Sequence, residues 1–121
     1  METVDHPPAM DKELLLKAFD DDWSFLQEVV EVFLSDYPRL LDELRKASQE
    51  RDSDLLMRAA HSLKGMLKNF QADSAAEVAF ELEAKGKSED FDGVRNQIKT
   101  LEKYITKVDQ MLRDMIKHQP G

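Results

Sequence analysis

The sequence contains no cysteine, which excludes disulfide bonds, thiolate metal ligands and cysteine nucleophiles together. It has no run of about 18 apolar residues, so we expect no membrane-spanning helix. The first ten residues, METVDHPPAM, lack a basic segment followed by an apolar core, so they do not read as a secretion signal. These absences favour a cytoplasmic protein.

Net positive charge is also absent. Acidic residues outnumber basic residues by 25 to 17, which gives a formal net charge of -8. Such a surface repels phosphate backbones, so nucleic acid is not an expected partner. Apolar residues make up 41% and charged residues 35% of the 121 positions, which is typical of one globular domain. A basic cluster in this acidic chain therefore needs an explanation.

Glycine and proline are scarce, at four each, and long helical patterns lie between them. In four segments, apolar residues recur at the three- and four-residue spacing of one helix face. The predicted inward residues are Leu26, Val29, Val30, Phe33, Tyr37, Leu40, Leu41, Leu44 and Ala47; Leu56, Ala59, Ala60, Leu63, Met66, Leu67 and Phe70; Ala75, Val78, Ala79 and Leu82; and Val94, Ile98, Leu101, Ile105, Val108, Leu112 and Met115. We therefore expect an all-α fold, an antiparallel up-down-up-down four-helix bundle with a short additional N-terminal helix.

Local signals place the ends of these helices. Residues 1–10 are predicted to be a disordered N-terminal tail and residues 11–121 the folded domain, with Asp11 capping the short first helix. Pro38 should kink the second helix without splitting it, because the apolar stripe stays in phase on both sides. Ser74-Ala-Ala-Glu77 matches a capping box, so the fourth helix is predicted to begin there.

One histidine falls on the outer face of the third predicted helix. At about 100° per residue, the inward residues lie within roughly 60° of Leu63, whereas His61 lies roughly 160° away. This angle excludes a core histidine and leaves two interpretations, an idle surface residue or a functional one. His6 and His118 lie near the ends of the chain and are predicted to be idle.

Basic residues surround His61. Its neighbours at helical spacing are Met57, Arg58, Lys64, Gly65 and Lys68. Three cations around one imidazole suit an anion, because a phosphorylated imidazole gains negative charge that they stabilise. Glycine inside a helix costs about 0.5–1 kcal/mol relative to alanine. Gly65, on the exposed face, therefore indicates a position kept clear for the approach of another protein.

The stretch Ala60-His61-Ser62-Leu63-Lys64-Gly65 resembles the histidine-containing phosphotransfer (HPt) family, especially the domains attached to hybrid sensor kinases. The resemblance covers nearly the whole chain. It implies that His61 is phosphorylated, that Lys64 lies beside the phosphoryl group and that Gly65 is the clearance position. Family members often place Gln or Glu against the histidine from twenty-two positions later, which is Glu83 here. That carboxylate would accept a hydrogen bond from Nδ1–H, fix the tautomer and leave Nε2 as the nucleophile.

One position departs from the family pattern. Members commonly carry glycine ten positions after the histidine, where this chain has Gln71. We therefore expect the third helix to end on a cap that needs no left-handed residue. If the chain reverses near residues 72–73, Glu83 lies at about the height of His61 on the next helix.

The resemblance implies a phosphorelay carrier that exchanges phosphoryl groups with the aspartate of response-regulator receiver domains, with a hybrid sensor histidine kinase as a further partner. The expected binding surface comprises Met57, Arg58, Gly65 and Lys68, with Phe25 or Val32 as further contacts. We expect no ATP, cofactor or metal site on this chain, and Mg²⁺ on the receiver. Because one bundle uses all four stripes, we also expect a monomer. A non-catalytic helical adaptor that binds receiver or kinase domains is the alternative.

Two other hypotheses fail. Gly86-Lys87-Ser88 resembles the end of a phosphate-binding loop, but Glu81 stands where that loop needs glycine, and a helix precedes it. A di-iron bundle needs glutamate three residues before a histidine, and none of the three histidines has one.

Overall fold

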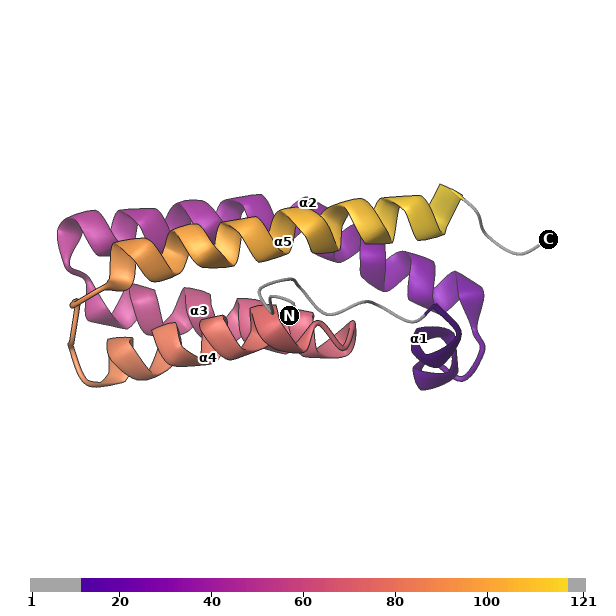
Figure 1. Cartoon of the computed structure of the whole chain (residues 1–121), viewed down its shortest axis with the longest axis horizontal. Coiled ribbons are helices and arrows are strands. Elements are labelled where there is room, and N and C mark those ends of the chain that lie inside the picture. Colours follow the sequence, from indigo (N-terminus) through magenta and orange to yellow (C-terminus); the bar gives the residue numbers. More distant parts are fainter. Residues whose placement is uncertain (1–11, 118–121) are drawn as a thin grey trace, which may run out of the picture.

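The computed structural model of the chain describes residues 12–117, which form five α-helices (Figure 1). The helices are α1 (Lys12–Ala18), α2 (Trp23–Glu50), α3 (Ser53–Asn69), α4 (Asp73–Lys87) and α5 (Val94–Lys117). Residues 12–117 contain no strand, and none of their helices is long and apolar enough to cross a membrane. The predicted tail, the Asp11 cap and His118 lie outside the described residues.

The four long helices form two layers, with α2 beside α5 and α3 beside α4 (Figure 1). Consecutive helices run in opposite directions, and the short α1 lies near the N-terminal end of α2. The pair α3–α4 packs most extensively, whereas the pair α2–α5 has the fewest close approaches among the packed pairs. The predicted antiparallel four-helix bundle with a short additional N-terminal helix is thus confirmed.

The core consists mostly of the predicted stripes. All seven residues predicted to face inward from α5 are buried. Four predicted residues on the other helices are only partly buried: Val29, Tyr37, Met66 and Val78. The helix α4 also buries three residues that were not predicted to face inward: Ala76, Glu83 and Gly86. The missed residues show that α4 packs against its neighbours more closely than its apolar residues alone suggest.

Aspartate residues cap the N-terminal ends of α2 and α3, and α3 carries His61. The carboxylate of Asp22 accepts a hydrogen bond from the backbone N–H of Phe25 at 3.0 Å, and Asp52 caps α3 in the same way through Leu55 N–H at 3.1 Å. The helix α2 continues through Pro38 without a break, so the prediction that proline does not split it is confirmed.

The predicted capping box at the start of α4 is wrong. The helix begins at Asp73, and its N-cap is Ala72, whose side chain offers no hydrogen bond. The turn between α3 and α4 is too short for a separate cap, because Ala72 N–H already bonds to Leu67 O at 3.0 Å to close α3. The fully buried Ala72 therefore ends one helix and begins the next.

The prediction that α3 ends without a left-handed residue is also wrong. Gln71 has a φ of 58°. Its N–H bonds to Lys68 O at 3.0 Å, and Ala72 N–H bonds to Leu67 O, which together form a Schellman motif. This motif needs a left-handed residue, so glutamine adopts the conformation that glycine adopts at lower cost. The chain reverses here in a tight turn, and α4 returns alongside α3.

Candidate functional site

His61 lies on the outer face of α3, and 67% of its side chain is exposed. The opposite face of the same turns is buried in the core through Ala60 and Leu63, each with no exposed surface. The helical pattern therefore predicted the orientation of this face correctly. An imidazole in this position is open to a second protein.

Glu83 of α4 faces the imidazole ring. Its Oε2 lies 2.9 Å from Nδ1 of His61, and only 7% of the Glu83 side chain is exposed. A carboxylate only accepts hydrogen bonds, so Nδ1 of the neutral ring carries the proton and donates a hydrogen bond to Glu83. Nε2 is then the unprotonated nitrogen, with its lone pair available to react.

Two lysines contact the same carboxylate. Lys64 Nζ lies 2.7 Å from Oε1 of Glu83, and Lys87 Nζ lies 3.8 Å from Oε2. Burial favours the neutral form of Glu83, but its interactions with Lys64 and His61 outweigh burial and lower its pKa below the usual value. Glu83 is therefore negatively charged at neutral pH. It links the imidazole to the neighbouring ammonium groups.

Phe80 completes the surroundings of Lys64. Its ring centroid lies 5.4 Å from Lys64 Nζ, and the lysine side chain is only 18% exposed. A cation over an aromatic face is stabilised by the ring quadrupole. Phe80 itself is half exposed and belongs to α4, three residues before Glu83. Helical periodicity does not predict this contact, because Phe80 and Lys64 come together only when α4 packs against α3.

The structure does not bring every predicted residue to the imidazole. Arg58 Nε binds the carboxylate of Asp54 at 2.8 Å, one turn earlier on α3. Lys68 is exposed and lines two shallow hollows, one shared with Phe80 and the other with Phe25. The cations that meet at Glu83 are instead Lys64 and Lys87, and Lys87 was not predicted.

Two glycines have opposite environments near the site. A Cβ built on Gly65 would have no other atom within 4 Å, which agrees with an open position on the surface. A Cβ built on the buried Gly86 would lie 2.7 Å from Met57 N and 2.9 Å from Met57 Cα. Backbone atoms cannot move aside as a side chain can. Gly86 therefore permits the close approach of α3 and α4, one turn from Glu83, with Met57 partly buried between them.

Residues 12–117 contain no group of three or more His, Cys, Asp or Glu side chains placed to hold a metal ion. The fold and the site together define a helical bundle that exposes one imidazole on its surface and fixes its proton with a buried carboxylate.

Comparison with known proteins extends this description. The family model described as the Hpt domain matches residues 28–115, so the chain belongs to the Hpt domain family. The protein thus has a histidine phosphotransfer role in two-component signalling, in which Hpt domains interact with receiver domains and kinases.

Solved structures show the same fold. Histidine-containing phosphotransfer protein B (HptB) from Pseudomonas aeruginosa PAO1 is 22% identical, with a TM-score of 0.84 over 93% of this chain and 98% of that one. The HPT domain of a sensor hybrid histidine kinase from Shewanella is 16% identical, with a TM-score of 0.79 over 93% of this chain and 97% of that one. No curated protein sequence matches the chain.

Proposed function

We propose that the protein is a phosphorelay carrier in which Nε2 of His61 exchanges a phosphoryl group with the aspartate of a response-regulator receiver domain. The observation that carries this proposal is the 2.9 Å contact between Nδ1 and the buried Glu83. It keeps the proton on Nδ1, so Nε2 of the exposed ring is a nucleophile without a separate deprotonation step.

The transfer needs no proton movement in the attack. The Nε2 lone pair forms a bond to phosphorus while the bond between phosphorus and the aspartate oxygen breaks, and the aspartate leaves as a carboxylate. The ring now carries a positive charge, which the Glu83 carboxylate stabilises through Nδ1–H. The reverse transfer uses the same bonds in the opposite order. Phosphoryl transfer depends mainly on in-line placement and charge neutralisation. The fixed orientation of the ring favours in-line placement.

The lysines supply the charge neutralisation that phosphoryl transfer needs. Lys64 and Lys87 meet at Glu83, so their ammonium groups lie near the imidazole and add positive potential where the phosphoryl group arrives. We assign no metal or cofactor to this chain and place Mg²⁺ on the receiver. The protein is therefore half of an active site and acts as a carrier rather than a self-sufficient enzyme.

The proposed docking surface surrounds the exposed face of α3. Two exposed aromatic residues flank it, Phe80 from α4 and Phe25 from α2, and Lys68 lies beside both. The surface at Gly65 is not covered by any other side chain of the described residues. Aromatic contacts with neighbouring cations are typical of protein interfaces. We propose that a receiver domain docks here, that a hybrid sensor histidine kinase is a further partner, and that the protein acts as a cytoplasmic monomer.

The test is a transfer assay with a phosphorylated receiver and Mg²⁺. The wild-type protein should acquire a phosphate that is labile in acid and stable in base. The His61→Gln variant should acquire none while its circular dichroism stays that of the wild type. Label that persists on this variant would refute the proposal. Binding of the receiver without any label on the wild type would indicate the adaptor instead.

A second variant tests the charge near the ring. Lys64→Ala should slow transfer by about tenfold or more, because it removes an ammonium group from the site. The matched control is Lys103→Ala, an exposed lysine on α5. Equal transfer rates for these two variants would remove Lys64 from the site.

A further inference from the structure

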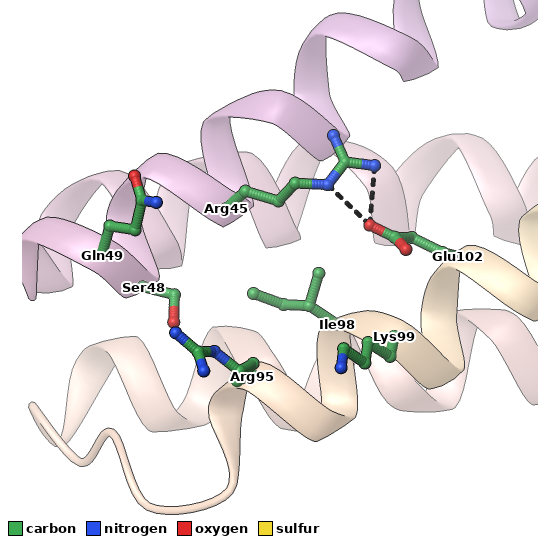
Figure 2. A pocket seen from close by; sticks show the side chains of 7 residues that line it. All are labelled: Arg45, Ser48, Gln49, Arg95, Ile98, Lys99 and Glu102. Atoms are coloured by element: carbon green, nitrogen blue, oxygen red, sulfur yellow. Dashed lines mark hydrogen bonds and ion pairs between the residues drawn. The ribbon is translucent and has the colours of Figure 1, made fainter.

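A second basic cluster lies in the layer of the bundle that does not carry His61. Figure 2 shows a groove between α2 and α5, with a volume of about 340 Å³. Its lining residues are Arg45, Ser48 and Gln49 from α2 and Arg95, Ile98, Lys99 and Glu102 from α5.

One wall of the groove is held in place by its own ion pairs. Arg45 Nε and Nη2 each lie 2.7 Å from Oε2 of Glu102, as the dashed lines in Figure 2 show. The remaining nitrogen of the guanidinium group, Nη1, binds the carboxylate of Asp42. These contacts pair Arg45 with two carboxylates, so an anion in the groove would be held by the other two cations.

The other two cations are not neutralised. Neither Arg95 nor Lys99 forms an ion pair or hydrogen bond with any residue of the described range 12–117. They lie four residues apart on α5, a spacing at which like charges repel and destabilise a helix. In a chain of net charge -8, an unpaired pair of cations that lines a cavity indicates a site for a bound anion.

The rest of the lining narrows the chemistry of that anion. Ser48 contributes a hydroxyl group that points from α2 toward Arg95 and can donate to an anion between the helices (Figure 2). Ile98, only 3% exposed, adds an apolar surface between them. A phosphoryl group has three terminal oxygens that can accept hydrogen bonds from these donors. A short carbon chain attached to it can contact the apolar surface.

We propose that the groove between α2 and α5 binds a small organic phosphate monoester through Arg95 and Lys99. The phosphoryl oxygens lie between these two cations and the hydroxyl group of Ser48, and the carbon chain lies on Ile98. This site is separate from His61 and does not depend on the transfer reaction.

The experiment is an NMR titration of the ¹⁵N-labelled protein with glycerol 3-phosphate at constant ionic strength. Backbone amides of residues 45–49 and 95–102 should shift along saturable curves, while those around His61 stay in place. Arg95→Gln and Lys99→Gln should each raise the dissociation constant about tenfold, since each removes one charge-assisted contact. Lys103→Gln is the matched control, because this exposed lysine lies on the same helix outside the groove.

Three results would overturn the proposal. The first is a linear, non-saturating response equal to that of added sodium chloride. The second is an equal loss of affinity in Lys103→Gln, which would indicate general attraction to the helix. The third is equally tight binding of succinate, which would show that the groove does not select the phosphoryl group.

Discussion

Two interfaces within the same bundle are built in opposite ways. Between α3 and α4, Gly86 lets the backbones approach closely, and the buried Glu83 spans the small remaining distance to His61. Between α2 and α5, long polar side chains bridge the helices, as Arg45 does to Glu102 and Tyr37 does to Asp109. Around Gly86 the first interface has little room between its backbones, and the second opens into a groove lined mainly by polar side chains.

The difference shows what each interface permits. At α3–α4 the position of Glu83 depends on how closely two backbones approach, so the imidazole is oriented by the fold rather than by flexible side chains. At α2–α5 long polar side chains bridge the exposed edge of the interface above its apolar core, and this edge opens into the groove.

The largest expected effect comes from adding one carbon to the close interface. Gly86→Ala should lower the free energy of unfolding by about 1–3 kcal/mol, because the new Cβ meets the Met57 backbone and forces α3 and α4 apart. The same displacement moves Glu83 from His61 and should slow phosphoryl transfer. Urea denaturation and the transfer assay measure the two effects.

Gly65→Ala is the matched control for stability. A Cβ at Gly65 meets no other atom within 4 Å, so alanine should raise the free energy of unfolding by about 0.5–1 kcal/mol through its helix propensity. Equal changes in stability at the two glycines would mean that the close approach of α3 and α4 does not depend on Gly86.

A smaller effect is expected at the polar interface. The Tyr37 hydroxyl donates to Asp109, which also binds Arg113 Nε at 2.6 Å. Tyr37→Phe should cost about 1 kcal/mol of stability, the usual net value of one hydrogen bond. Transfer through His61 should be unchanged, since the α3–α4 interface stays intact. A slower transfer would contradict the independence of the two interfaces.

The same hydrogen bond has a pH signature. Burial, followed by the hydrogen bond and charge of Asp109, raises the pKa of Tyr37 from 10.0 to about 12. The unfolded chain loses this proton at lower pH than the folded chain does. The contribution is therefore complete below pH 10 and is lost as the pH rises from 10.0 to about 12. Stability measured across this range should fall more steeply in the wild type than in Tyr37→Phe.

The comparison also explains what the sequence could predict. Apolar periodicity predicted every buried residue of α5 and the exposed side of His61, because helix geometry alone decides which face a residue occupies. It missed Gly86 and Phe80, whose importance arises from contacts with the neighbouring α3. The α2–α5 groove was missed for the same reason, since Arg45 and Arg95 are distant in sequence. Periodicity predicted which face of a helix each residue occupies, whereas the one contact between helices that was expected, Glu83 with His61, came from the family resemblance and the position of the turn.

The turn at the end of α3 was predicted incorrectly and gives the smallest expected effect. Gln71→Gly should raise the free energy of unfolding by about 0.5–1 kcal/mol. Glycine removes the strain of a side chain at a φ of 58°, and the greater freedom of glycine in the unfolded chain offsets part of this gain. Urea denaturation measures the change, with Gln110→Gly, an exposed glutamine within α5, as the control that should be destabilised by about 1 kcal/mol.

Transfer through His61 should keep its wild-type rate in Gln71→Gly. The Schellman bonds from Gln71 and Ala72 already define the register in which α4 returns along α3, and glycine forms the same bonds without strain. Glu83 therefore stays 2.9 Å from Nδ1 of His61. A loss of stability in this variant would mean that the glutamine side chain itself holds the turn, and a changed transfer rate would mean that the turn does more than join the two helices of the close interface.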